Sequence, residues 1–277
     1  MDRHAPQVAA RLDGRAAVAA ATRQRLRLTH MQASLPLLCL PCAGASATMY
    51  LRWRRALPRW IEVVPVELPG RGGRLGERFV DDFDRMVAQL CAEHEGVLRG
   101  RYALFGHSMG ALLAWGMAQH QRLQHRPLPD ALIVSGSAAP SQRDPDRFLD
   151  KTDDAALIAD LRKQGGTPDE LFDSPELLRM TLDTLGADYR LCRSFVHADP
   201  APLPVPLHVL AGRQDDIAPW RMQAWAAETA HVRFTLEGFE GGHFFIRQHE
   251  TPVLAALARH LAPAVMAGGV DAARALA

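Results

Sequence analysis

Short, uninterrupted runs of apolar residues recur along the chain and predict strands that are buried on both faces. These runs lie at residues 35–40, 61–68, 102–105, 131–135, 207–211 and 232–236. Between them, residues 81–98 and 111–119 carry apolar side chains at the spacing of a helical face. Buried strands that alternate with helices indicate an α/β fold, with a mostly parallel central sheet and helices on both of its faces.

The pattern changes between residues 141 and 206, where short amphipathic stretches replace the strands. These stretches lie at residues 155–164 and 175–185, and a proline-rich segment, 200–206, then leads to the next apolar run. An all-helical excursion within a strand–helix alternation is typical of an insertion. We therefore predict a helical lid above the sheet at about residues 141–206.

The length of 277 residues suits one large α/β domain or two small ones. The first convincing strand begins soon after Met31, so we predict a flexible N-terminal extension (residues 1–30), one domain (31–265) and a C-terminal tail (266–277). An upstream start codon or an amphipathic transit peptide are alternative interpretations of the Ala- and Arg-rich extension. It lacks the continuous apolar segment of a secretory signal.

Composition narrows the class of protein without indicating an activity. The 32 basic and 31 acidic side chains nearly cancel, which argues against a nucleic-acid binder because phosphate contacts need a clustered basic excess. No apolar run approaches the roughly 18 residues of a membrane span. We therefore expect a globular, monomeric, cytoplasmic protein with neither a membrane nor a nucleic acid as its partner.

The four cysteines are too few for a disulfide framework in a chain of this length. They are Cys39, Cys42, Cys91 and Cys192. Cys39 and Cys42 form a C-x-x-C motif, but neither a second ligand pair nor a thioredoxin-like setting accompanies it. We expect structural thiols, and no metal or cofactor.

A candidate nucleophile lies between a predicted strand and a predicted helix. Gly106-His-Ser-Met-Gly110 matches the G-x-S-x-G motif, in which a serine occupies a sharp strand-to-helix turn at the carboxyl edge of a sheet. The two glycines allow strand and helix to approach closely. Ser108 would also lie at a helix N-terminus, where the helix dipole favours the negative charge that develops during acyl transfer.

A serine nucleophile needs a base, and the base needs a group that orients it. In this architecture the chain order is Ser, then Asp or Glu, then His. Asp215 follows the predicted strand 207–211 and is the favoured acid, with its neighbour Asp216 as the alternative. His243 follows the last predicted strand and is the favoured base.

The other histidines near these strands are less suitable as the base. His231 precedes the last strand and would lie at its opposite end, and His249 lies in a turn further along the chain. His107 adjoins the serine, but we expect the side chain beside a nucleophile in a tight turn to point elsewhere. Two backbone N–H groups are expected to form the oxyanion hole: that of Met109, which follows the serine, and that of Ala43, in the loop after the first strand.

At this point the sequence resembles the type II (editing) thioesterases that accompany nonribosomal peptide and polyketide synthases. The matching segments are Leu40-Pro-Cys-Ala-Gly-Ala-Ser46, Leu68-Pro-Gly-Arg-Gly-Gly-Arg74, Gly106-His-Ser-Met-Gly110, Gly165-Gly-Thr-Pro168 and Gly242-His-Phe-Phe245. They span about residues 35–260. The resemblance implies an α/β-hydrolase that removes misprimed or stalled acyl groups from the phosphopantetheine thiol of a carrier protein, which would be its partner.

Three positions depart from the family pattern. Cys42 replaces a usual His or Tyr, Ala45 replaces a Gly, and Gly186 stands where an Arg is usual, so a contact of the lid is expected to be missing. Arg71 and Arg74 are candidates for contact with an acidic carrier protein, the alternative being ordinary solvated surface.

Two other functions remain open at this stage. One is a carboxylesterase or lipase of the same fold that acts on small oxygen esters. The other is a catalytically inactive relative that only binds a carrier protein.

Overall fold

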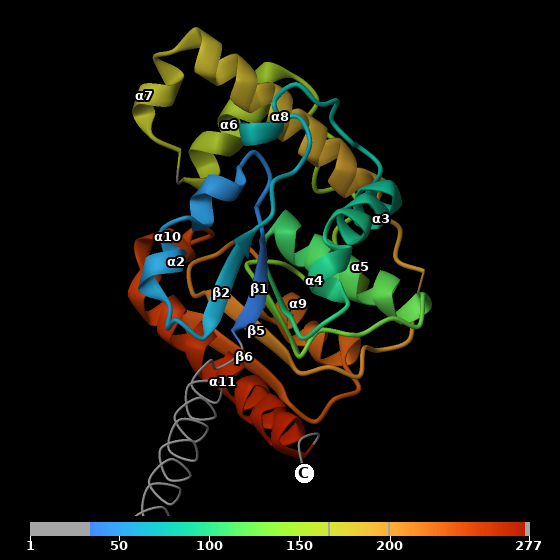
Figure 1. Ribbon diagram of the computed structural model, residues 1–277. Helices are drawn as coiled ribbons and strands as arrows, with labels where there is room; N and C mark the ends of the chain where they lie inside the picture. The colour runs from blue at the N-terminus through green and yellow to red at the C-terminus, as the bar shows by residue number, and fades with distance from the viewer. Residues whose placement is uncertain (1–33, 166, 199, 275–277) are drawn as a thin grey trace, which may run out of the picture. The chain divides into compact units, whose positions relative to one another are not determined.

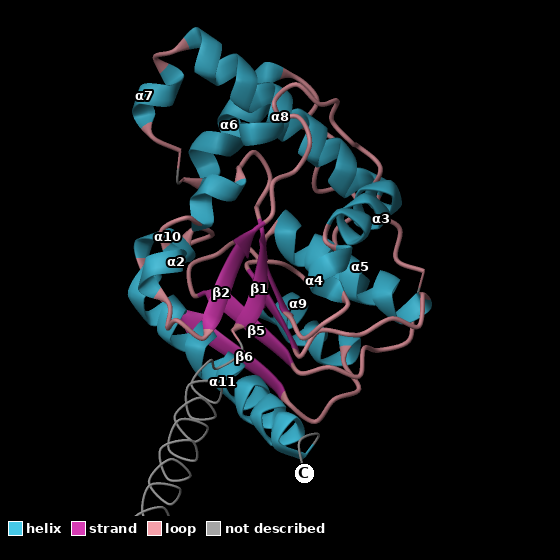
Figure 2. Cartoon of the chain, viewed as in Figure 1, coloured by secondary structure: helices cyan, strands magenta, loops and turns pink. Residues whose placement is uncertain are grey.

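The computed structural model describes residues 34–274 except 166 and 199. The predicted extension, residues 1–30, lies outside the described residues. Residues 35–274 contain one six-stranded sheet in the order β2-β1-β3-β4-β5-β6, and every neighbouring pair is parallel (Figures 1 and 2). The strands are β1 (Leu35–Leu40), β2 (Ile61–Pro65), β3 (Ala103–His107), β4 (Ala131–Ser135), β5 (Leu207–Gly212) and β6 (Phe234–Phe239). The prediction of an α/β fold with a parallel sheet is confirmed.

Two groups of helices cover the sheet. The longer helices among them are α3 (Phe83–Glu93), α5 (Met109–Leu123) and α11 (Glu250–Arg274). The shorter ones are η1 (Ala47–Tyr50), α2 (Trp53–Ala56), η2 (Gly72–Arg74), α4 (Glu95–Leu98), η3 (Pro140–Gln142), α9 (Pro219–Gln223), η4 (Ala224–Glu228) and α10 (Phe245–Gln248). Within the described residues, no helix is long and apolar enough to cross a membrane.

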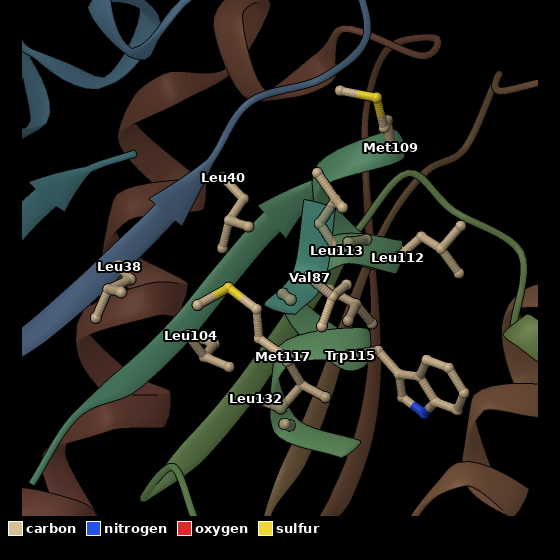
Figure 3. Packing of buried hydrophobic residues seen from close by; sticks show 14 of the residues in the cluster. Leu38, Leu40, Val87, Leu104, Met109, Leu112, Leu113, Trp115, Met117 and Leu132 are labelled. Atoms are coloured by element: carbon tan, nitrogen blue, oxygen red, sulfur yellow. The ribbon is translucent and has the colours of Figure 1, made fainter. Parts of the chain in front are cut away.

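Alternate residues of the central strands enter two different hydrophobic cores. In β1, Leu38 and Leu40 pack toward α3 and α5, whereas Leu37 and Cys39 pack toward α2 and α11. Figure 3 shows the first of these cores, where Met117 of α5 lies beside Leu104 of β3, while Leu112 and Trp115 point away from the strands. Because both faces are covered, the central strands β1 and β4 are almost entirely apolar, which is why short apolar runs revealed them.

Several boundaries differ from the sequence prediction. The last strand begins at Phe234 and ends at Phe239, because its pairing with β5 extends to Gly212, while the side chain of Val232 is 96% exposed. The predicted helix 81–98 is interrupted at His94 and becomes α3 and α4. β2 ends at Pro65 instead of residue 68.

The segment between β4 and β5 forms a helical lid. Its helices are α6 (Asp154–Gln164), α7 (Asp169–Phe172) and α8 (Pro175–Ser194). They share a small apolar cluster that contains Leu157, Leu182, Leu185 and Tyr189. In Figure 1 they lie together beyond the carboxyl ends of β1 and β2, on the side where the loops after the strands carry the candidate site residues.

Candidate active site

Ser108 adopts a backbone conformation that few non-glycine residues accept. Its φ is 55° and its ψ is −116°, and it links the end of β3 directly to the first residue of α5. The Ser108 N–H donates to the Ser135 carbonyl oxygen at 2.8 Å, which ties the turn to β4. Strain of this kind persists only where the surroundings enforce it, and it is the geometry expected of a serine at a nucleophile elbow.

The glycines of the elbow, the segment Gly106-His-Ser-Met-Gly110, are required by close backbone contacts. A Cβ on Gly106 would lie 2.0 Å from the carbonyl oxygen of Gly110. A Cβ on Gly110 would lie 2.2 Å from the carbonyl oxygen of Leu40 in β1. Neither backbone atom can move without displacing a strand or a helix, so the motif spacing has a direct steric cause.

The structure brings Asp215 and His243 into a direct hydrogen bond. The Nδ1 atom of His243 lies 2.9 Å from Oδ2 of Asp215, and the side chain of Asp215 is fully buried. The carboxylate accepts this bond, so Nδ1 carries the proton and Nε2 is left as the basic nitrogen. Ser108 and His243 line the same cavity.

Asp216, the alternative acid, makes different contacts. It pairs with two cations of the lid segment: Arg147, 3.6 Å away, and Lys163, 3.2 Å away. Partial burial opposes ionisation, but the charge of Arg147, the hydrogen bonds with Lys163 and Asp215 and the charge of Lys163 together lower the pKa of Asp216. Of the two neighbouring acids, Asp215 therefore contacts the candidate base, whereas Asp216 contacts the lid.

His107, which the sequence analysis did not select as the base, lies beside the candidate base in the structure. Its fully buried ring lies 5.0 Å, centroid to centroid, from the ring of His243, and its Nδ1 is 2.9 Å from the Ser135 hydroxyl. Burial, and then the charges of His243 and Arg247, hold the pKa of His107 well below its ordinary range. His107 is thus a neutral side chain packed beside the candidate base. Its position next to the serine was the only available signal in the sequence.

The candidate oxyanion groups belong to residues that line the same cavity. Ala43 and Met109 both line the cavity with Ser108, and in the described part of the chain neither backbone N–H donates a hydrogen bond. Unpaired N–H groups that face a cavity next to a nucleophile are suited to bind a developing oxyanion. Gly44 has a φ of +75°, whereas Ala45 has no positive φ, so alanine at position 45 does not strain the loop.

The cavity itself has a volume of about 770 Å³ and extends from the elbow to the lid. Its lid wall includes Leu171, Thr181, Leu185 and Tyr189. This volume falls within the range that holds small organic ligands.

The structure corrects the prediction for one of the two candidate arginines. Arg71 is only 5% exposed and forms two hydrogen bonds with the carboxylate of Asp188, so it is neither a docking residue nor solvated surface. Arg74, whose side chain is 20% exposed, is paired with Glu77 and Glu93, and its contact with a carrier protein stays a prediction. The sequence could not reveal the contact of Arg71 because Asp188 lies 117 positions further along the chain.

The cysteines are buried thiols in the described residues. Cys39 and Cys42 are both free, and burial raises the pKa of Cys42 to about 11. Within the same residues, no group of three or more His, Cys, Asp or Glu side chains could hold a metal ion. Cys42 lines the cavity.

The parallel sheet, the strained serine between β3 and α5 and the Asp215–His243 pair on the loops after β5 and β6 define a protein of the α/β-hydrolase type. The thioesterase domain family model matches residues 35–264, and the chain belongs to this family. The resemblance noted in the sequence is thereby confirmed.

Individual relatives agree with this assignment. The chain is 34% identical to thioesterase PikA5 from Streptomyces venezuelae over 81% of this chain and 80% of that protein. It is 35% identical to the protein named linear gramicidin dehydrogenase LgrE from Brevibacillus parabrevis, over 81% of this chain and 86% of LgrE. Among solved structures, the type II thioesterase BorB from the borrelidin biosynthetic cluster matches with a TM-score of 0.75 and 35% identity, over 82% of this chain and 93% of BorB.

The name of LgrE denotes an oxidoreductase, which raises the question of whether this chain has the residues of a dinucleotide site. A dinucleotide site on an α/β sheet normally uses a G-x-G-x-x-G turn after the first strand. The corresponding loop here, residues 41–47, contains a single glycine. The residues at the sheet edge are those of a serine hydrolase.

Proposed function

We propose that this protein hydrolyses acyl thioesters on the phosphopantetheine thiol of carrier proteins, and so releases acyl groups from a nonribosomal peptide or polyketide synthase. The observation that carries the proposal is the strained Ser108, which shares a cavity with His243 while His243 is bonded to Asp215. Membership of the thioesterase family and the likeness to BorB, a type II thioesterase, support the substrate class.

In the proposed first half-reaction, Nε2 of His243 takes the hydroxyl proton of Ser108, and Oγ attacks the thioester carbonyl carbon. The carbonyl oxygen becomes an oxyanion held by the N–H groups of Ala43 and Met109. Collapse of this intermediate breaks the C–S bond, and the imidazolium of His243 gives its proton to the leaving sulfur. The products are a free thiol on the carrier protein and an acyl ester on Ser108.

In the second half-reaction, His243 takes a proton from water, and the resulting nucleophile attacks the acyl ester. The C–Oγ bond breaks, Oγ regains the proton from His243, and a carboxylic acid leaves. Asp215 holds the imidazole in the required tautomer and stabilises its charged form in both halves. The serine supplies the nucleophile, so the scheme requires no cofactor of the enzyme's own, and phosphopantetheine arrives with the carrier protein. The scheme operates within a single chain, and the monomeric state stays a prediction.

The experiment compares one acyl group on three leaving groups: a phosphopantetheinylated carrier protein, a free pantetheine thioester and an ethyl ester. We expect the highest kcat/KM for the carrier-protein thioester. We expect Ser108→Ala to lower kcat by roughly 10⁴-fold or more and to abolish labelling by a fluorophosphonate. Higher activity on the ethyl ester would instead identify an oxygen esterase, and full activity of Ser108→Ala would exclude the serine mechanism.

A further inference from the structure

The loop that carries Ala43 is held by carboxylates from two different parts of the molecule. At its far end, the Ser46 hydroxyl donates to Glu67 Oε2 at 2.7 Å and the Ala47 N–H donates to Glu67 Oε1 at 3.0 Å. Glu67 follows β2 and belongs to the sheet side of the molecule. This end of the loop is therefore attached to the sheet and does not depend on the lid.

The end of the loop nearest the candidate oxyanion hole is held by the lid. The Gly44 N–H donates to Oδ2 of Asp188 at 2.8 Å, across 144 positions of sequence. Asp188 lies in the lid helix α8 and is 1% exposed. The Gly44 N–H belongs to the peptide unit that joins Ala43 to Gly44, so this bond sets the ψ angle of Ala43.

Arg71 completes the connection between lid and loop. Its Nη1 and Nη2 donate to the two carboxylate oxygens of Asp188, each at 2.6 Å, and Nη1 also donates to the Ala45 carbonyl oxygen at 3.2 Å. The side chains are 5% and 2% exposed. A two-bond arginine–carboxylate pair has a defined geometry, and burial shields it from competing water.

Apolar packing reinforces the same junction. Ala43 packs against the apolar cluster of the lid, and a Cβ on Gly44 would lie 3.3 Å from Cδ1 of Leu185 in α8. The loop thus contacts α8 through the Arg71–Asp188 pair and, one helical turn away, through the side chain of Leu185. The contact that we expected Gly186 to remove stays a prediction, and Asp188, two positions further along α8, joins the lid to the loop.

We propose that Asp188 is a positioning residue for the oxyanion hole, so that the Ala43 N–H is aligned only while α8 is docked on the loop. This inference rests on the proposed function, because it assigns the Ala43 N–H to the developing oxyanion. The lid then has a second role besides bordering the cavity. A molecule whose lid helix has moved away contains Ser108, Asp215 and His243 but has a misaligned oxyanion donor.

The test uses Asp188→Asn, which keeps the size of the side chain and removes its charge. We expect kcat to fall between about 10- and 100-fold, less than for complete removal of an oxyanion donor, with KM changed less than about threefold. A trifluoromethyl ketone that carries the same acyl group forms a tetrahedral oxyanion on Ser108, and its affinity should fall by the same factor as kcat. Substrate affinity measured in the Ser108→Ala background should not change.

Two further variants separate positioning from loss of folding. Leu261→Ala removes a fully buried side chain of α11 on the other face of the sheet, and we expect a lower Tm with unchanged kcat. Arg71→Lys keeps the positive charge but loses the two-bond geometry, so its kcat and ketone affinity should lie between those of the wild type and Asp188→Asn. It also provides a second measurement if Asp188→Asn does not fold.

The proposal is overturned if Asp188→Asn, or Arg71→Lys where the former does not fold, lowers Tm but leaves kcat and ketone affinity within twofold of the wild type. A loss of kcat in Leu261→Ala equal to that in Asp188→Asn overturns it as well. The same variants are also assayed with an activated aryl ester. If the wild type hydrolyses this ester but not the carrier-protein thioester, the proposed substrate is wrong, while the ester kinetics still test the role of Asp188.

Discussion

The elbow and the lid are held in place by different physical means. Around the elbow, Ser108 is fixed by backbone atoms in van der Waals contact and by apolar packing of α5, most of whose residues are buried. The lid has a small apolar cluster, and ion pairs at its surface, such as Arg179–Asp154 and Arg190–Asp81, supplement it. Close packing resists any change of shape, whereas exposed ion pairs are weak individually and are screened by salt. The elbow is therefore expected to respond to steric changes, and the lid to changes of charge.

Two glycine substitutions, one in the elbow and one in the lid, have the largest expected effects and test the difference between these regions. Gly110→Ala would place a Cβ 2.2 Å from a backbone oxygen of β1, so we expect loss of activity and a destabilisation of about 3 kcal/mol or more, in the range of severe core changes. Gly186→Ala in α8 would meet only Leu157 and Arg190 at ordinary contact distances, 3.6 and 3.7 Å. There we expect a gain of about 0.5–1 kcal/mol from helix propensity. Urea unfolding measures both effects, and equal effects of the two substitutions would refute the contrast.

The adjacent acids Asp215 and Asp216 offer a second comparison, one at the base and the other at the lid. Asp215→Asn leaves the shape intact but favours the wrong tautomer of His243, so kcat should fall by about 10³- to 10⁴-fold. Asp216→Asn removes only half-exposed ion pairs with Arg147 and Lys163, and kcat should change less than about fivefold. Steady-state kinetics with an acyl carrier protein as the substrate distinguishes the roles of the two acids. A larger loss for Asp216→Asn would make Asp216 the orienting acid.

We expect a decrease in pH to destabilise the sheet before it affects the ion pairs of the lid. His208 in β5 is 5% exposed, with its Nδ1 2.8 Å from the Thr235 hydroxyl, and burial followed by the neighbouring His260 lowers its pKa to about 3. Between that pKa and the value of about 6.5 in the unfolded chain, the unfolded state binds the extra proton. The free energy of unfolding is therefore highest above pH 6.5 and falls with decreasing pH, by up to about 1.4 kcal/mol per pH unit for this group.

The measurement is urea unfolding at several values between pH 7.5 and pH 4.5. His208→Asn keeps a polar side chain near Thr235 and removes the titrating ring, so its stability should fall less steeply with acid than that of the wild type. Identical slopes would contradict the prediction. Over the same pH range the lowered pKa of Asp216 keeps its lid ion pairs charged, and added salt is expected to weaken these pairs by less than about 1 kcal/mol, the smallest effect of the series.

The sequence was sufficient for features that depend on neighbouring residues. Apolar runs of five or six residues located β1 and β4 at their observed bounds, because a strand buried on both faces is apolar throughout. The glycines around Ser108 indicated the elbow, since only glycine fits where two backbones nearly touch. Chain order indicated Asp215 and His243, and the structure brings them within hydrogen-bonding distance.

Tertiary structure decided the features that depend on distant residues. Nothing in the local sequence indicates that Arg71 meets Asp188, 117 positions further along, or that His107 packs against His243. The choice between Asp215 and Asp216 also needed coordinates, because adjacent side chains on a loop point in directions that only their surroundings determine. The sequence by itself determined the sheet, the elbow and the order of the chemical groups, since each is encoded within a few residues. The connection of lid to oxyanion loop arises only when the chain packs, because it joins two charged residues that no single segment contains, and their mutual hydrogen bonds must offset the cost of burying both charges.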